Sequence, residues 1–278
     1  LLKEFNRERN LDPKLVESLA KAKSKGYESW QEAKEKSDFK IFLPFFEELV
    51  KLRIEEAKQI SDQYSPWETL AQPFEPELTL KWLNKMFQPL KDTLPELIRG
   101  INKSKKYHWD LSPESQQNLC SKLLDEFGRD KDLVVVGKSP HPFSITLGPN
   151  DYRITTRIVE GEPLSSFLAT AHEWGHSIYE QGLPSQSHQW FAWPLGQATS
   201  MGIHESQSLF WENRIVKSKS FSKRFFKKFV SAGCTLNNYF ELWKSINHLE
   251  AGLNRVEADE LTYGLHILVR TELEIDLI

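Results

Sequence analysis

The first 130 residues place apolar side chains at helical spacing, with Pro, Gly and polar residues between the runs. The segment 39–62 is the most strongly patterned, because its large apolar residues return every three or four positions and suit one buried face. The pattern predicts a helical N-terminal part over residues 1–130, with its polar positions turned to solvent. The predicted helices are 13–25, 39–62, 76–100 and 113–127.

The pattern changes between residues 131 and 160, where β-branched and aromatic residues form short runs bounded by Gly and Pro. These runs predict a small sheet inserted into a helical protein. In the last run Asp151, Arg153 and Thr155 alternate, so their side chains share one face. Two interpretations are open, the exposed polar face of an edge strand or a polar strand that lines a cleft. The predicted strands are 134–136, 143–147 and 152–155.

Residues 161–278 return to helical spacing, and Pro163 and Gly182 suit the start and the end of the first helix. In the last helix, several polar residues fall within about a quarter of the circumference. Such a stripe indicates either a solvated face or a wall that faces a substrate. Its members are Arg255, Asp259, Tyr263, His266 and Arg270. The predicted helices are 163–181, 194–216 and 254–270, and the whole chain, 1–278, is expected to form one domain.

Composition and charge narrow the function classes. The 278-residue chain has a net charge of −3, so its charge does not point to nucleic acid or to an anionic membrane as a partner. Two cysteines, Cys120 and Cys234, argue against a disulfide framework. The first ten residues lack the apolar core of a signal peptide, and no apolar run approaches a membrane span. We therefore expect a soluble, cytoplasmic protein without nucleic-acid or membrane partners.

The stretch from His172 to His176 reads H-E-W-G-H, an H-E-x-x-H motif inside a predicted helix. Two imidazoles four residues apart lie on one side of a helix, within reach of a single tetrahedral zinc ion. Glu173 lies beside them and is placed to act as a general base on water at the metal. Both histidines border the apolar stripe of their helix, at the rim between core and cleft where a metal ligand belongs.

A zinc site with two imidazoles requires a third ligand. Glu205 follows His176 by twenty-nine residues, which suits a second helix packed against the first. Glu205 is the natural third ligand, and Glu212 is the other near candidate among the acidic residues downstream. A His, His, Glu set leaves an open position for water, as catalytic zinc sites do. One zinc ion per chain is expected, and cobalt(II) suits the same ligands.

These features resemble the thermostable carboxypeptidase family, the Taq-type metallocarboxypeptidases. The resemblance runs from about residue 40 to the end of the chain, with the blocks in the order and spacing of the family. The blocks are His141-Pro142-Phe143, Asp151-Tyr152-Arg153-Ile154-Thr155, His172 to His176, His204-Glu205-Ser206-Gln207 and Ala258-Asp259-Glu260-Leu261-Thr262-Tyr263.

The resemblance implies a mainly helical, zincin-like metallopeptidase with a deep cleft and a small β-sheet insertion. It implies a homodimer and broad removal of C-terminal amino acids from peptides with a free C-terminus. It assigns the metal to His172, His176 and Glu205, and the catalytic base to Glu173. Arg255 matches the arginine that holds the substrate carboxylate in the family.

Two features depart from the family pattern. Family members are considerably longer, so the resemblance predicts a chain that is incomplete at its C-terminus. In many peptidases with a glutamate ligand, an aspartate four residues later orients a ligand histidine, and here that position is Leu209. The second-shell partner is therefore expected from Asp259 or Glu260.

The predicted activity is metal-assisted hydrolysis at a peptide end. Arginine suits recognition of the terminal carboxylate, with Arg153 and Arg270 as candidates behind Arg255. Tyr263 and His248 are candidate donors to the developing oxyanion, and His141 is a further candidate substrate contact. Two alternatives remain open: a zinc endopeptidase that shares the metal site without carboxylate recognition, and a truncated, non-catalytic helical binding protein.

Overall fold

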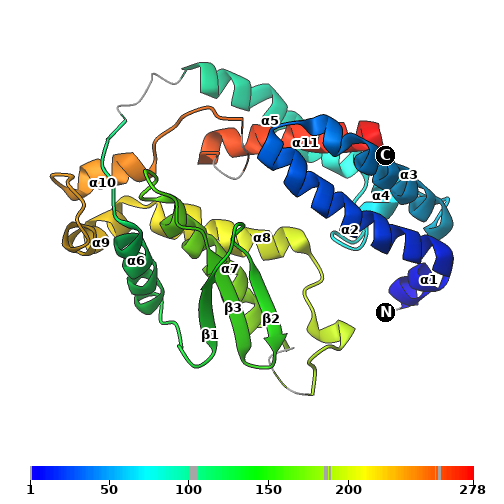
Figure 1. Cartoon of the computed structure of the whole chain (residues 1–278), viewed down its shortest axis with the longest axis horizontal. Coiled ribbons are helices and arrows are strands. Elements are labelled where there is room, and N and C mark those ends of the chain that lie inside the picture. Colours follow the sequence, from blue (N-terminus) through cyan, green and yellow to red (C-terminus); the bar gives the residue numbers. More distant parts are fainter. Residues whose placement is uncertain (1, 101–105, 185–186, 188, 254, 256–257) are drawn as a thin grey trace. The chain divides into compact units, whose positions relative to one another are not determined.

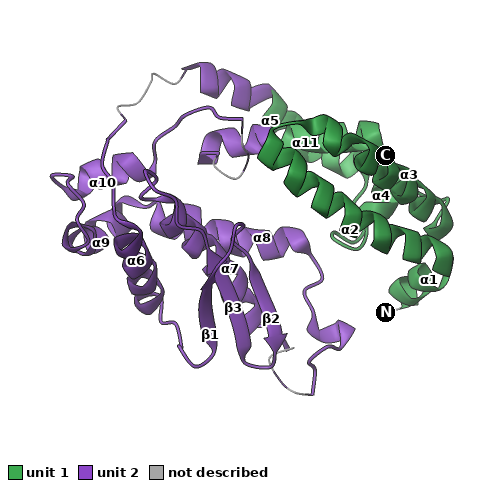
Figure 2. Cartoon of the chain, in the orientation of Figure 1, with its two compact units in different colours: residues 1–91, 267–278 green, residues 92–266 purple. Residues whose placement is uncertain are grey.

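The computed structural model in Figure 1 describes residues 2–100, 106–184, 187, 189–253, 255 and 258–278. The prediction of a mainly helical protein with a small sheet is confirmed. The chain forms two compact units, residues 1–91 with 267–278 and residues 92–266 (Figure 2). The single domain expected over 1–278 stays a prediction.

The first unit is built from helices alone in the part of it that the structure describes. Asp12 caps α2 through a hydrogen bond from the backbone N–H of Lys14, and Ser65 and Glu68 form a capping box on α4. The unit contains α1 (Leu2–Arg9), α2 (Pro13–Lys36), η1 (Phe39–Ile41), α3 (Leu43–Ile60), α4 (Pro66–Ala71), the first part of α5 (Leu80–Gly100) and the last part of α11 (Glu260–Leu277).

Helix α2 is longer than predicted, since it continues past residue 25 to Lys36. Its second half buries small residues, Gly26, Ser29 and Ala33, which carry little hydrophobic signal in the sequence. A Cβ at Gly26 would lie 3.0 Å from the side chain of Leu49, so small residues allow α2 and α3 to approach closely.

The second unit holds the sheet and the H-E-x-x-H helix. Its elements are α6 (Pro113–Glu126), β1 (Val134–Lys138), β2 (Ser144–Gly148), β3 (Asp151–Thr156), α7 (Ser165–Gln181), η3 (Pro194–Gly196), α8 (Met201–Leu209), η4 (Phe210–Val216), α9 (Lys219–Ser231) and α10 (Tyr239–Ile246), with the remaining parts of α5 and α11. Helix α7 contacts α6, β2, β3, α8 and η4, so it lies at the centre of this unit.

The strands pair in the order β1-β3-β2, with β1 parallel and β2 antiparallel to β3. The three predicted strands are thus present, but β3 is central rather than an edge strand. Tyr152 and Ile154 are buried and share a cluster with Trp174 of α7, so one face of the sheet packs on the H-E-x-x-H helix. Asp151 and Arg153 lie on the opposite, more exposed face, as their alternation predicts.

An aromatic core fixes the first half of α7. Phe167 is buried, and its ring centroid lies 5.5 Å from that of Phe225 and 4.9 Å from that of Phe229, both on α9. Burying a large aromatic side chain stabilises a fold by about 3 kcal/mol. The helix that carries the motif is therefore packed against both α9 and the sheet.

The predicted helices 194–216 and 254–270 also differ from the structure. The segment 194–216 divides into a 3₁₀ turn, α8 and the π-helical η4. The last helix begins at Glu260. The carboxylate of Asp259 caps it, because this carboxylate accepts hydrogen bonds from the backbone N–H groups of Leu261 and Thr262. Residues 254, 256 and 257 of the predicted helix lie outside the described residues. Among the helices described, none has the length and apolarity that a bilayer crossing requires.

Candidate metal centre

Three side chains from two neighbouring helices converge. His172 and His176 of α7 lie one turn apart, with ring centroids 4.9 Å from each other. The Oε2 atom of Glu205, on α8, lies 3.7 Å from Nε2 of His172 and 3.3 Å from Nε2 of His176. One donor atom of each residue falls within 4.8 Å of the others.

This donor set fits a divalent metal. Metal–ligand distances of about 2.0–2.1 Å in a tetrahedron separate neighbouring donors by roughly 3.3 Å, close to the distances from the Glu205 oxygen. Burial acts to raise the pKa of Glu205, but its hydrogen bond with His176 and the charges of both imidazoles hold that pKa below its usual value. Glu205 is therefore an anionic oxygen donor beside two nitrogen donors, the chemistry of a catalytic zinc site.

Gly175 explains how Glu205 reaches the histidines. A Cβ at this position would lie 2.4 Å from Cα of Ser208 and 2.6 Å from the carbonyl oxygen of Gln207. Both are backbone atoms of α8, which cannot rotate away. The glycine inside the motif thus permits backbone contact between α7 and α8, and this contact sets the position of Glu205.

Glu173 lies in a nearly dry environment, since only 7% of it is exposed. Burial raises its pKa to about 7, against the opposing charge of His172 and with help from the carboxylates of Glu205 and Glu212. A carboxyl group with a pKa near neutrality can both take up and release a proton. Glu173 therefore has the properties of a general acid and base beside the three candidate ligands.

His172 is oriented by a residue that the sequence offered only as an alternative ligand. Its Nδ1 atom lies 3.0 Å from Oε2 of Glu212, on η4. The other oxygen of Glu212 lies 3.2 Å from Nζ of Lys217, whose side chain is 7% exposed. Burial acts to raise the pKa of Glu212, but the hydrogen bond to His172 and the Lys217 charge keep it lowered. An ionised Glu212 accepts the Nδ1 proton and leaves Nε2 facing Glu205.

His176 has a different neighbour. Its Nδ1 atom lies 2.6 Å from Nδ1 of His204, and Nε2 of His204 lies 2.7 Å from Oε1 of Glu180. No role for His204 or Glu180 was predicted from the sequence. Local signals existed, because His204 directly precedes Glu205, and Glu180 follows His176 by one helical turn.

Two predicted substrate residues reach this cluster. The hydroxyl of Tyr263 donates a hydrogen bond to Oε1 of Glu205 at 3.3 Å and accepts one from Nη1 of Arg255 at 3.3 Å. Burial raises the pKa of Tyr263, and the Glu205 charge adds to the effect. The hydroxyl thus stays protonated, and the Arg255 guanidinium lies two hydrogen bonds from a candidate metal ligand.

The other predicted residues have different partners. Arg153 pairs with Asp151 on the exposed face of β3, with Nε and Oδ1 2.9 Å apart. His248 lies 3.4 Å from Glu250, and the backbone carbonyl of His141 accepts from Ser139. Arg270 belongs to the first unit and pairs with Glu274 along α11.

The predicted second-shell carboxylates also differ from the contacts observed. Asp259 accepts hydrogen bonds from backbone N–H groups at the start of α11 and from that of Glu250, while Glu260 pairs with Arg214 at 3.3 Å. The partners given to the ligand histidines among the described residues are instead Glu212 and His204. Asp259 acts as a helix cap, so its carboxylate oxygens are occupied by backbone N–H groups and are not available to a ligand histidine.

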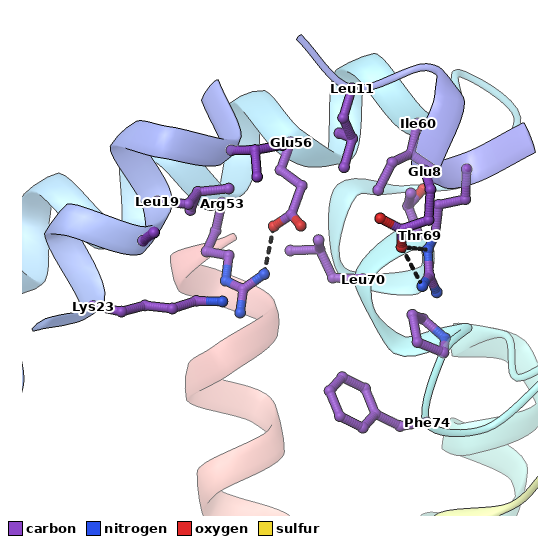
Figure 3. Close-up of a pocket in the computed structure, with 14 residues that line it drawn as sticks. Glu8, Leu11, Leu19, Lys23, Arg53, Glu56, Ile60, Thr69, Leu70 and Phe74 are labelled. Atoms are coloured by element: carbon purple, nitrogen blue, oxygen red, sulfur yellow. Dashed lines mark hydrogen bonds and ion pairs between the residues drawn. The ribbon is translucent and has the colours of Figure 1, made fainter. Parts of the chain in front are cut away.

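A separate hollow of about 360 Å³ lies wholly within the first unit (Figure 3). Four of the five charged residues that line it form two pairs, and Lys23 is the fifth: Arg53 lies 2.5 Å from Glu56, and Arg7 lies 2.7 Å from Glu8. Paired charges leave little net attraction for a charged ligand. The hollow therefore lacks the chemistry concentrated around α7.

An H-E-x-x-H helix with a carboxylate on a second, closely packed helix defines the zincin class of metallopeptidases. The family model described as carboxypeptidase Taq (M32) metallopeptidase matches residues 1–278, and the chain belongs to this family. The resemblance seen in the sequence is thereby confirmed, and family and cluster together support a metal cofactor.

Individual carboxypeptidases are similar to this chain in sequence and in structure. Thermostable carboxypeptidase 1 of Thermus thermophilus is 36% identical over 292 residues, which cover 98% of this chain and 56% of that protein. Carboxypeptidase 1 of Bacillus subtilis is 36% identical over 263 residues, covering 90% of this chain and 51% of that protein. A solved carboxypeptidase of Pyrococcus furiosus, described as Apo-Mg, has a TM-score of 0.89 at 28% identity, with 99% of this chain and 56% of that one covered. The chain spans about half the length of the curated relatives it matches.

Proposed function

We propose that this chain carries the catalytic site of a zinc metallocarboxypeptidase that removes C-terminal amino acids from peptides. The observation that carries the proposal is the hydrogen-bonded series from Glu205 through Tyr263 to Arg255. An arginine two hydrogen bonds from a metal ligand is placed to hold a free carboxylate while the adjoining peptide bond lies at the metal. Arg255 is thus assigned to substrate recognition.

His172, His176 and Glu205 would hold the zinc ion, and cobalt(II) would suit the same three donors. When bound, the metal supplies Lewis-acid activation of water and of the scissile carbonyl. Glu173 takes up a proton from the attacking water and delivers it to the leaving amine. The raised pKa of Glu173 suits this exchange, although a nearby divalent cation would lower it by favouring the carboxylate.

Tyr263 is assigned as a donor to the oxygen on which charge develops. Its hydroxyl keeps its proton and already lies beside Glu205, where a substrate carbonyl would be drawn. His248 is the weaker candidate for this role, because its ring nitrogen faces Glu250. The substrates would be peptides with free C-termini, and a homodimer in the cytoplasm is proposed from the family resemblance alone.

The zinc endopeptidase remains the competing function, since it would use the same metal ligands and the same base. It would not require Arg255 to meet a carboxylate. Peptides of one sequence with free and amidated C-termini separate the two activities. A carboxypeptidase releases amino acids only from the free form, whereas an endopeptidase cleaves both. A non-catalytic helical binding protein would cleave neither, with or without zinc.

Arg255→Ala tests the carboxylate assignment directly. Truncating one partner of a desolvated charge pair costs about 2–5 kcal/mol, so kcat/KM for free-ended peptides should fall roughly 30- to 5000-fold. Zinc content should stay at the wild-type level. The matched control is Arg224→Ala, which removes an exposed arginine paired with Glu126. Wild-type kcat/KM in Arg255→Ala would assign the role to another arginine.

A further inference from the structure

His204 and Glu180 lie next to the candidate metal ligands without belonging to them. The family resemblance gave these two residues no role. Glu180 follows His176 by one turn of α7, and His204 directly precedes Glu205 on α8. The two imidazoles lie with their ring centroids 4.6 Å apart and their planes 35° from each other. Tyr179 meets His204 edge to face, with centroids 5.1 Å apart, and helps to fix the plane of that ring.

The side chains of this series are largely shielded from water, with 15% of His176, 12% of His204 and 20% of Glu180 exposed. Hydrogen bonds in such surroundings are stronger than at the surface, and each buried polar atom needs a partner of the correct kind. The donors and acceptors must therefore be consistent along the whole series.

A metal ion on Nε2 of His176 would fix the protons in one order, because it would take the lone pair of that nitrogen. An ionised Glu180 can only accept, so the 2.7 Å contact requires a proton on Nε2 of His204. A neutral His204 then has a lone pair on Nδ1, and the 2.6 Å contact requires a proton on Nδ1 of His176. With its proton on Nδ1, His176 keeps the lone pair of Nε2 for a metal that Glu205, whose oxygen lies 3.3 Å from this nitrogen, would share.

We propose that Glu180 and His204 form a positioning relay that holds His176 in the tautomer able to bind the metal. The proposal rests on the metal site proposed above and extends it beyond the three ligands. The two ligand histidines would then be oriented in different ways, His172 directly by Glu212 and His176 through an intervening imidazole. Both arrangements end in an anionic carboxylate, as second shells of zinc histidines commonly do.

The tautomers are measured in the zinc-loaded chain, because without an ion the Glu205 carboxylate itself faces Nε2 of His176. Long-range ¹H–¹⁵N NMR spectra of that form distinguish the two tautomers of each ring. The proposal predicts that His176 carries its proton on Nδ1 and His204 on Nε2. The opposite form at either ring would overturn it, and so would a doubly protonated His204, which would have to donate to His176.

Variants test whether the relay acts on the metal. Glu180→Gln offers the ring both a donor and an acceptor, so His204 should populate both tautomers, and zinc affinity should fall about 10- to 100-fold. His204→Phe keeps a flat ring without nitrogen and should weaken zinc binding to a similar extent. Affinity is measured by competition with a chromophoric chelator. Glu162→Gln, an exposed carboxylate before α7, is the matched control and should bind zinc as the wild type does.

A double-mutant cycle separates a relay from two independent structural effects. Adding Glu180→Gln to His204→Phe should leave zinc affinity unchanged within about twofold, because the connection is already broken. Additive losses would overturn the proposal, as would wild-type affinity in both single variants. If the wild type binds no zinc, the proposed metal site fails and the relay fails with it. If zinc binds but the tautomers are reversed, the relay fails and the site stands.

Discussion

Glu173→Gln is expected to abolish most peptide hydrolysis while zinc stays bound. The glutamine keeps the size of the side chain and can neither accept nor release the proton of the attacking water. General acid–base groups contribute about 10²- to 10⁴-fold to rate, so kcat for a free-ended peptide should fall by that factor. The residue is buried beside the ligands rather than among them, so metal content should not change. Single-turnover rates and element analysis of the same sample measure both quantities.

The control for this substitution is Glu160→Gln, which makes the same chemical change at an exposed residue before α7. Its kcat and zinc content should match the wild type. Wild-type turnover in Glu173→Gln would show that another group takes the proton. Loss of zinc from that variant would show that the carboxylate acts on the metal, which contradicts the role assigned here.

Gly175→Ala should remove zinc binding with little change in the stability of the fold. A Cβ needs about 3.4 Å from its neighbours, and at Gly175 it would meet Cα of Ser208 at 2.4 Å, so α8 would shift by roughly 1 Å. Metal sites tolerate deviations of about 0.2 Å in ligand distance. Displacement of Glu205 by this amount should lower zinc affinity by at least about a hundredfold.

The expected stability change of Gly175→Ala is smaller because two effects oppose each other. Overpacking costs about 1–3 kcal/mol, while alanine in place of glycine within a helix stabilises it by about 1 kcal/mol. Gly182→Ala, at the end of the same helix, is the control, because its Cβ would meet the carbonyl oxygen of Tyr179 at 3.4 Å. Zinc titration and thermal unfolding of both variants separate the effects. Full zinc affinity in Gly175→Ala would show that the α7–α8 contact does not position Glu205.

Local periodicity was sufficient to predict the motif helix and all three strands. Helix α7 has a strong apolar stripe ending near Gly182, and the strands are bounded by Gly and Pro. The end of α2 was missed because Ser29 and Ala33 are buried through close packing rather than hydrophobicity. Nothing local in the sequence marks the association of residues 267–278 with residues 1–91, because the two segments lie far apart along the chain.

The candidate site was predictable where chemistry follows spacing along one or two helices. His172, His176 and Glu205 satisfy that condition. Glu212 was seen only as a possible ligand, because nothing in the sequence marked the π-helical segment on which it lies. The partners of His176 depend on a contact between α7 and α8, which no pattern within either helix contains. The capping contact of Asp259 has no local signal for the same reason, since it depends on where α11 begins.

The central claim is that His172, His176 and Glu205 bind one divalent ion. It is tested most directly by anomalous diffraction at the zinc edge from crystals of the chain grown with one equivalent of zinc. The account predicts a single strong peak within about 2.0–2.2 Å of Nε2 of both histidines and of a carboxylate oxygen of Glu205. A peak at another place, or a Glu205 carboxylate turned out of coordinating range, would contradict it.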